Sequence, residues 1–281
     1  VKPHTRLAGQ FESGLIKMLM IGLGKHLGAT LYHQVFPQFD YSLNDLAPSI
    51  VRMILDRMPV TLGVAIVEDA YENTSHVEVV AAADFLKREP ELLELAKSRM
   101  PGLPFDRADL LIVDRIGKEI SGCGMDTNVI GRKSNDKAAA IDEWPKVRNI
   151  FVRSLTEQTK GNGCGIGIAE YCHQRVLDSI DMDVTRINCI TSAHPSAGAI
   201  PLTYGADRDA LCDALAQVNP DRPEGVRCLW IRDTLTLGVL ACSEAYLAEA
   251  ERREDLQVLD APHDLGFDGD GNLREFDALL S

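Results

Sequence analysis

The sequence predicts an α/β fold, because strand-like apolar runs alternate with amphipathic helical segments along its 281 residues. The clearest strands are "ADLLIVDRIG" at 108–117 and "VRNIFVRSL" at 147–155, whose unbroken apolar character is typical of buried strands. The composition, 45% hydrophobic and 25% charged residues, is typical of a globular protein with a substantial core. One large or two medium domains fit this length.

Two prolines and a glycine within "PGLPFD", at 101–106, mark the best candidate linker in the chain. We therefore expect one domain at 1–103 and a second, α/β domain at 104–281. Because Val1 is not a natural start, we also expect that the chain is truncated at its N-terminus.

In the first domain, the helical pattern of 13–33 is interrupted by Gly22, Gly24 and Gly28, which predicts two short helices around a glycine hinge. The next predicted elements are a helix at 44–58, strands at 60–69 and 75–84, and a helix at 85–100. After its two long strands, the second domain is predicted to contain a helix at 168–180, a strand at 184–192, a helix at 207–217, a strand at 226–232, a strand or a strand and turn at 235–241, and a helix at 243–253.

The charge and cysteine content restrict the partners and the location of the protein. A net charge of −13 argues against nucleic acid and against a basic membrane-binding face, since anionic phosphates repel such a surface. The longest apolar runs are far shorter than the ~18 residues of a membrane span, and no signal-peptide pattern is present. Seven cysteines without a CxxC pair suit free thiols in a reducing cytosol. We expect a cytoplasmic protein that binds small molecules.

The opening segment carries the most informative residues. Lys17 lies in "ESGLIKMLM", where apolar neighbours on both sides would lower its pKa and favour a nucleophilic amine. The alternative is a lysine that snorkels from an amphipathic helix. His4 follows a proline that favours extended backbone, and a histidine there could exchange protons near neutral pH. His33, taken alone, fits an ordinary core or surface histidine as well as a metal ligand.

The spacing of these residues resembles the cofactor segment of the nickel-pincer lactate racemase family. The matching positions are Pro3-His4, Ala8-Gly9, Ser13-Gly14, Lys17, Gly22 and His33. The resemblance implies two α/β domains with the active site in the interdomain cleft, and it makes 1–103 the C-terminal part of the cofactor-carrying domain. It also implies that Lys17 carries a pyridinium-thiocarboxylate nickel-pincer nucleotide covalently, that His33 ligates nickel, and that His4 is a catalytic acid/base. About three extra residues separate His4 from Lys17, which indicates a divergent branch.

Substrate contacts are expected from the second domain. "ADLLIVDRIGKEISGCGMDTNVIGR" is similar to the family's strand and D-x-N loop, with Asp126 and Asn128 in the matching places. The glutamine and lysine that follow in lactate racemases are replaced at 131–133. Arg132 could clamp a substrate carboxylate bidentately, and Lys118 could serve the same purpose, while a surface arginine after a turn is the alternative.

The resemblance therefore predicts an isomerase, a nickel-dependent racemase or epimerase of a 2-hydroxy acid, that depends on cofactor-synthesis proteins. It implies that a second acid/base histidine and a substrate-binding arginine belong to a preceding part of the protein, so this chain can be inactive alone. Two rival hypotheses remain open. One is a non-catalytic homologue that binds a hydroxy acid or sugar acid, and the other is an enzyme that forms a Schiff base at Lys17.

Overall fold

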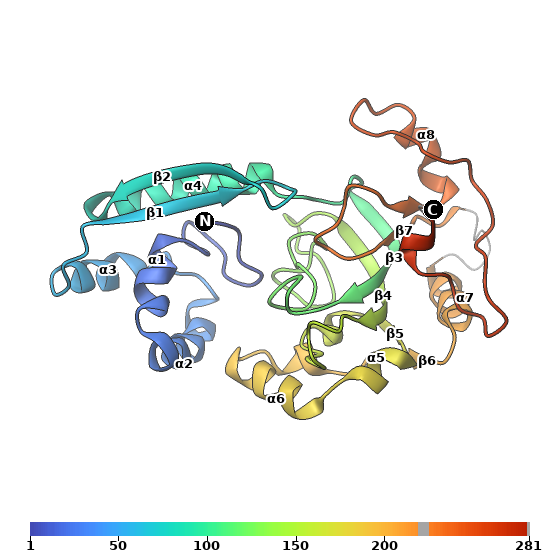
Figure 1. Ribbon diagram of the computed structural model, residues 1–281, viewed down its shortest axis with the longest axis horizontal. Coiled ribbons are helices and arrows are strands. Elements are labelled where there is room, and N and C mark those ends of the chain that lie inside the picture. The colour runs from blue at the N-terminus through green and yellow to red at the C-terminus, as the bar shows by residue number, and fades with distance from the viewer. Residues whose placement is uncertain (219–224, 280–281) are drawn as a thin grey trace. The chain divides into compact units, whose positions relative to one another are not determined.

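The computed structural model describes residues 1–218 and 225–279 and shows a mixed α/β protein (Figure 1). The chain divides into two compact units. Val1–Gly102 and Thr191–Ala193 form the first unit, and Leu103–Ile190 and His194–Ser281 form the second.

The first unit begins with short helices, as the glycine pattern predicted. They are α1 (Leu15–Lys17), the π-helix η1 (Met18–Gly22), α2 (Lys25–Val35), the 3-10 helix η2 (Phe36–Phe39) and α3 (Ala47–Leu55). Gly24 is needed at the turn before α2, because a Cβ atom there would lie 2.8 Å from the Cα of Gly28. The predicted pair of helices around a glycine hinge and the helix at 44–58 are confirmed.

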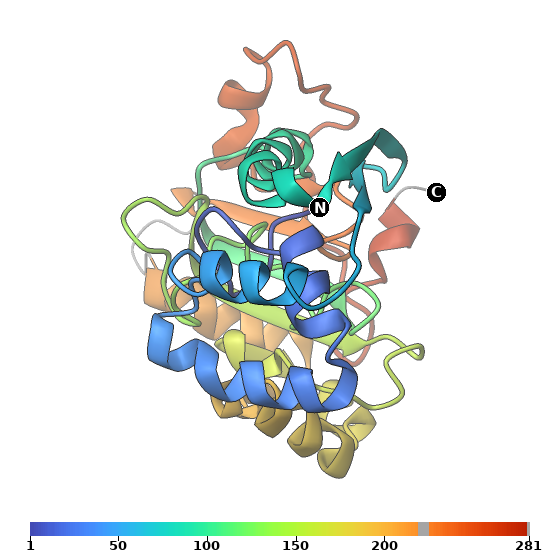
Figure 2. The same cartoon turned by 90° about the vertical axis from the view of Figure 1, so that its left-hand side faces the viewer.

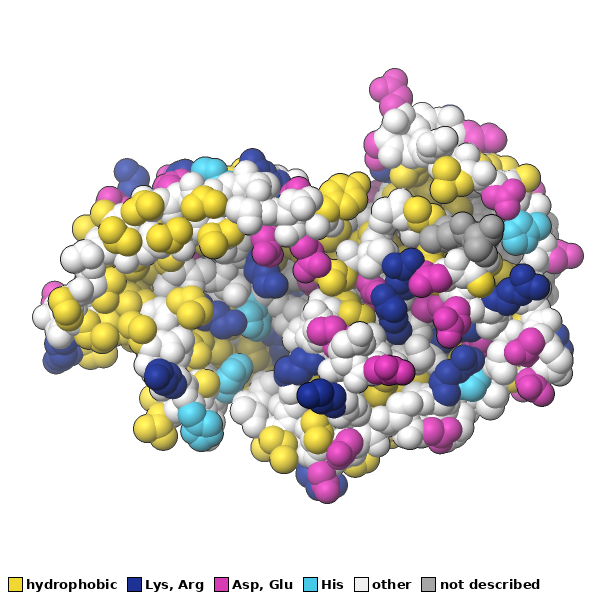
Figure 3. Space-filling view, in the orientation of Figure 1, with side chains coloured by type: hydrophobic (Ala, Val, Ile, Leu, Met, Phe, Trp, Pro, Cys, Tyr) yellow, Lys and Arg dark blue, Asp and Glu magenta, His cyan; other side chains and the backbone are white. Residues whose placement is uncertain are grey.

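An antiparallel hairpin and a long helix complete the first unit. Strand β1 (Leu62–Glu68) pairs with β2 (Thr74–Ala81), and the 3-10 helix η3 (Ala82–Asp84) leads into α4 (Phe85–Arg99), all close to the predicted ranges. Figure 2 shows α4 beside the hairpin, where it packs on one face of the two strands. The other face is apolar and exposed, as the space-filling view shows along the hairpin (Figure 3); its side chains are those of Leu62, Val64, Ile66, Val77 and Val79.

A six-stranded sheet forms the centre of the second unit, with the order β6-β5-β4-β3-β7-β8. The strands are β3 (Arg107–Ile116), β4 (Lys146–Leu155), β5 (Tyr171–His173), β6 (Leu202–Tyr204), β7 (Cys228–Ile231) and β8 (Ala241–Cys242). All neighbours are parallel except β7 and β8. The predicted strands at 108–117, 147–155 and 226–232 are confirmed.

The sheet is buried on both faces, which explains the unbroken apolar runs of its central strands. Leu111 and Val113 of β3 belong to a core cluster that also contains Val176 of α5 (Gln174–Ser179). Leu110 and Ile112, on the opposite face, share a second cluster with residues of α7 (Asp207–Val218), the helix predicted at 207–217. Successive side chains of a strand point to opposite faces of the sheet, so β3 contributes residues to two separate core clusters.

Two predicted elements are wrong. The range 168–180 contains the 3-10 helix η4 (Ile166–Ile168), strand β5 and helix α5, and α5 begins where Nδ1 of His173 accepts the backbone N–H of Arg175. The predicted strand at 184–192 is instead the helix α6 (Met182–Thr191). Its β-branched residues suggested a strand, but Asp181 caps the helix by accepting the N–H groups of Asp183 and Val184.

The last predicted elements are shorter than expected. Of the strand predicted at 235–241, only Ala241 is paired, in the two-residue strand β8. The helix predicted at 243–253 is reduced to the 3-10 helix η7 (Glu244–Tyr246) and α8 (Leu247–Ala250). Two further 3-10 helices are η5 (Pro195–Gly198) and η8 (Phe276–Leu279). The seven cysteines are free thiols, as predicted. Among the helices of residues 1–218 and 225–279, none is long and apolar enough to cross a membrane.

Candidate functional site

Lys17 is a half-buried lysine at the C-terminal end of α1, next to the fully buried Ile16. Burial, together with the positive charge of Lys2, lowers the pKa of its amine from 10.5 to about 8. At pH 7, about a tenth of such amines are neutral, compared with fewer than about one in a thousand ordinary lysines. The environment of Lys17 therefore favours a nucleophilic amine.

The backbone around Lys17 has an unusual conformation. The π-helix Met18–Gly22 follows it directly, with the N–H of Leu23 donating to the carbonyl of Met18 at 3.0 Å. Single π-turns are rare and often occur at functional sites, because they alter the direction of neighbouring side chains. Lys17 thus lies at a position where the helix departs from regular geometry.

Glu89 of α4 supports the segment that carries Lys17. Its side chain is 1% exposed, and Oε2 accepts the N–H of Ile16 at 2.6 Å. A Cβ atom at Gly14 would lie 2.6 Å from the carboxyl carbon of Glu89, so this close approach requires glycine. The carboxyl group therefore satisfies a free N–H group at the start of α1.

The stability of the protein is expected to depend on the ionisation of Glu89. Burial raises the pKa of its carboxyl from 4.5 to about 7, while the N–H of Ile16 opposes this shift. The folded state holds the proton of Glu89 more tightly than the unfolded state does. The protonated carboxyl therefore contributes its full stabilisation of the fold below pH 4.5, and this contribution is lost as the pH rises through about 7. The free energy of unfolding should fall by about 3 kcal/mol over that range, measured by urea denaturation at several pH values.

The matched variants for this prediction are Glu89→Gln and Glu94→Gln. Glutamine at 89 retains the acceptor for Ile16 but does not titrate, so this variant should lose the Glu89 contribution to the pH dependence. Glu94 is on the same helix, and its side chain is 73% exposed, so Glu94→Gln should keep the wild-type pH dependence. An unchanged pH dependence in Glu89→Gln would contradict the prediction.

His4 is half-buried, and both its backbone and its imidazole ring form hydrogen bonds. Its backbone N–H donates to Oε2 of the buried Glu12 at 2.7 Å, and its Nδ1 accepts the N–H groups of Arg6 and Leu7, each at 3.0 Å. These contacts require the tautomer with the proton on Nε2. His4 can therefore donate a hydrogen bond from Nε2. Acceptance of a proton at Nε2 requires that Nδ1 first give up both contacts.

His33 lies in the last turn of α2 and is half-buried. Its ring contacts the edge of Phe36, with the ring centroids 5.6 Å apart. Phe36 belongs to the same core cluster as Leu7, whose N–H donates to His4, and Ile16, which precedes Lys17. The three residues predicted from the cofactor segment, His4, Lys17 and His33, thus all belong to the first unit.

Arg132 has a different role from the one the sequence suggested. It is fully buried in the second unit, where its guanidinium forms an ion pair with Glu170 at 2.8 Å and also donates to the carbonyls of Ile168, Val147 and Arg148. These contacts occupy the outer N–H groups that a substrate carboxylate would need. We conclude that Arg132 fixes the long loop between β3 and β4, and we assign it no substrate contact.

The other two predicted substrate residues also lie in the second unit. Lys118 is exposed, and its backbone N–H donates to Oγ1 of Thr159 at 3.2 Å. Asn128 donates from both its backbone and its side chain to Oδ1 of Asp126, at 2.8 and 2.9 Å. The Asp126–Asn128 pair therefore stabilises its own loop, and a substrate contact by Asn128 or Lys118 stays a prediction.

Glu89 is a residue of this site that the sequence analysis did not single out, because it is one of many charged residues in the helix predicted at 85–100. The signal was nevertheless present. Glu89 occupies the helical stripe of buried α4 residues, which are Phe85, Glu89, Leu92, Leu93 and Ala96. A carboxylate on an apolar stripe indicates a buried acid that has a specific partner.

Comparison of the chain with protein-family models, curated proteins and solved structures finds no significant match. Within the described part of the chain, no cluster of three or more histidine, cysteine, aspartate or glutamate side chains is arranged to hold a metal ion.

Proposed function

We propose that the protein is a nickel-pincer-dependent racemase or epimerase of a 2-hydroxy acid. The observation that carries the proposal is Lys17, a half-buried lysine with a pKa of about 8 in a segment that resembles the cofactor attachment site of lactate racemases. The family's arrangement, two domains with the active site in the interdomain cleft, is part of the proposal.

The residues of the first unit fit the implied cofactor by their chemistry. The neutral amine of Lys17 is a suitable nucleophile for a covalent link to a thiocarboxylate cofactor. A pincer group brings its own sulfur and carbon donors to nickel, so the protein must supply one further ligand, and the imidazole of His33 suits it. When bound, the cofactor supplies the site that accepts and returns a hydride from the substrate.

The remaining chemistry belongs to the side chains of this chain. Because Nδ1 of His4 accepts two backbone N–H groups, the proton lies on Nε2, from which His4 would orient the hydroxyl or carbonyl oxygen of a bound substrate. For proton transfer by His4, the ring must exchange its Nδ1 contacts with Arg6 and Leu7 for a proton. Glu12 holds the backbone of His4, and Glu89 holds the helix of Lys17, so both function as positioning residues.

The proposal is tested by intact mass and metal analysis of the chain after co-expression with pincer-synthesis enzymes. We expect a covalent mass increase and one bound nickel ion per chain. His33→Ala should retain the mass increase but lose nickel, because the proposal assigns the imidazole to the metal and the covalent link to Lys17. His26→Ala is a matched control, since His26 is an exposed histidine of the same helix.

The other outcomes identify the rival functions. A chain that gains neither adduct nor nickel contradicts the racemase proposal and favours a non-catalytic binding protein. The low pKa of Lys17 also suits a Schiff-base enzyme. In that case borohydride would trap a carbonyl compound on Lys17, with no requirement for nickel.

A further inference from the structure

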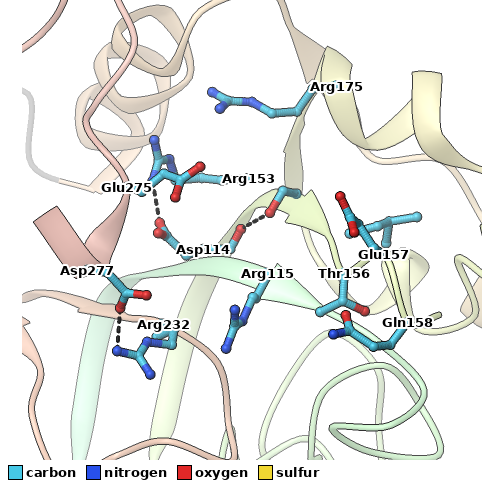
Figure 4. Close-up of a pocket in the computed structure, with 12 residues that line it drawn as sticks. Asp114, Arg115, Arg153, Thr156, Glu157, Gln158, Arg175, Arg232, Glu275 and Asp277 are labelled. Carbon is cyan, nitrogen blue, oxygen red and sulfur yellow. Dashed lines mark hydrogen bonds and ion pairs between the residues drawn. The ribbon is translucent and has the colours of Figure 1, made fainter.

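The second unit contains a cavity of about 410 Å³ at the carboxyl ends of its parallel strands (Figure 4). Each of the four arginines in its lining forms an ion pair with an aspartate; these arginines are Arg115, Arg153, Arg175 and Arg232. The lining also contains four carboxylates, so its charges balance and select no ligand. A surface with a clearer requirement for a partner belongs to the first unit.

Five aliphatic side chains form an exposed surface on one face of the β1–β2 hairpin (Figure 3). They make up what we call the hairpin face, their exposed fractions lie between 46% and 63%, and they belong to Leu62, Val64, Ile66, Val77 and Val79. The strand register places Val64 opposite Val79 and Ile66 opposite Val77. The five side chains therefore form one continuous, uncharged block across both strands.

The opposite face of the hairpin is also apolar, but it is covered. Ala65 of β1 and Val80 of β2 are buried in a core cluster with Phe85 and Leu92 of α4. An antiparallel sheet that faces water on one side normally carries polar residues on that side. The hairpin therefore has the composition of a sheet that is covered on both faces, and the chain covers one of them with α4.

The area of the hairpin face fits a contact between two identical chains. Each of its side chains is about half exposed and presents roughly 80 Å², so the five together present roughly 400 Å² of apolar surface. Two such faces in contact would bury roughly 800 Å² of apolar surface. Because protein interfaces are about 60% apolar, the whole contact would bury about 1,300 Å², which lies within the range of specific interfaces.

The charges at one end of the hairpin select the relative direction of two such hairpins. The turn end carries three acidic residues, Glu68, Asp69 and Glu72. Two turns at the same end would repel each other, so the hairpins would pack with their turns at opposite ends. The two-fold axis then runs across the strands, which places β1 over β1 of the second copy and the central Val64 over its own counterpart.

We propose that the hairpin face joins two copies of this chain in a two-fold symmetric dimer, with the hairpins packed face to face and their turns at opposite ends. An uncharged aliphatic face gives no advantage to a partner of complementary charge, whereas it complements a second copy of itself. The side chains of two such sheets interdigitate at a sheet spacing of about 10 Å. The inference is independent of the proposed racemase function, because it uses no residue of the candidate site.

The dimer is tested by analytical ultracentrifugation of the full chain over a wide range of protein concentration. We expect an equilibrium between a species of 30.8 kDa and one of twice that mass. Val64→Lys and Val79→Lys should each weaken association at least about tenfold, because each copy would bring a lysine to the same interface. Both valines are more than half exposed, so the variants should fold like the wild type, as checked by circular dichroism. Val258→Lys is the matched control, since Val258 is an exposed valine of the second unit.

A mixture of two variants tests the arrangement within the dimer. Val64→Lys and Val64→Glu should each associate weakly alone, whereas their mixture should form a heterodimer, because the lysine of one copy would meet the glutamate of the other. Wild-type association of a folded Val64→Lys, or a mixture that does not associate, would overturn the proposal. A wild-type chain that stays monomeric would also overturn it, and would leave a different polypeptide as the occupant of the hairpin face.

Discussion

Lys17→Met is expected to abolish the covalent adduct completely while it stabilises the fold. Methionine has nearly the length of the lysine stem but no amine, so no covalent link can form. Burial lowers the pKa of Lys17 from 10.5 to about 8. The charged amine therefore destabilises the folded state most below pH 8, and this cost disappears as the pH rises toward 10.5. At pH 7 the substitution should therefore raise the free energy of unfolding by about 1–3 kcal/mol.

This pairing of effects separates a chemical role from a structural one. Adduct formation is measured by intact mass after co-expression with the pincer-synthesis enzymes, and stability is measured by urea denaturation at pH 7. Lys87→Met is the control, because Lys87 is exposed on α4 and should change neither quantity. An adduct on Lys17→Met would show that another residue carries the cofactor. A destabilised Lys17→Met would show that the lysine stabilises the fold.

Asp207→Asn is expected to cause the largest loss of stability among the changes considered. Asp207 is fully buried in the first turn of α7, and Oδ2 accepts from Nε and Nη2 of Arg153 at 3.0 and 2.8 Å and from the N–H of Leu273 at 2.9 Å. The asparagine is uncharged and leaves the buried guanidinium only partly compensated. Loss of one partner from a buried ion pair costs about 3–5 kcal/mol.

The control for this prediction lies two residues away on the same helix. Asp209 is exposed in the first turn of α7, so Asp209→Asn should lose only the favourable interaction with the helix dipole, about 0.3–1 kcal/mol. Urea denaturation followed by far-ultraviolet circular dichroism measures both variants. Equal losses of stability in the two variants would mean that the buried network contributes no more than a surface charge.

The sequence predicted the elements whose local pattern and tertiary environment agree. The runs at 108–117 and 147–155 are buried on both faces of the sheet, and their continuous apolar character reports this directly. The prediction of a strand at 184–192 was wrong because the exposed residues of α6, which are Val184, Ile187 and Ile190, are β-branched. The buried residues of this helix, Thr185 and Cys189, have helical spacing. In such a segment, the residues that decide the structure are not the most hydrophobic ones.

In the candidate site, too, some residues could be recognised from local sequence and others only from the tertiary fold. A lysine between apolar residues could be recognised from local sequence, because burial of Lys17 follows from its immediate neighbours. Glu89 lies 72 residues further along the chain, and only the tertiary fold places it against α1. Likewise, Arg175 and Arg232 each follow a strand without a distinctive motif, and it is the strand order that brings them to one cavity.

The buried tryptophan gives the second unit an optical property of its own. The chain has two tryptophans, of which Trp230 is 3% exposed and Trp144 is 58% exposed. The indole of Trp230 donates to Asp114, and the guanidinium carbon of Arg153 lies 5.3 Å from its ring centroid. Because the emission of an indole responds to nearby charges, Trp144→Phe would leave one tryptophan whose fluorescence reports on the buried ion pair of Asp114 and Arg153.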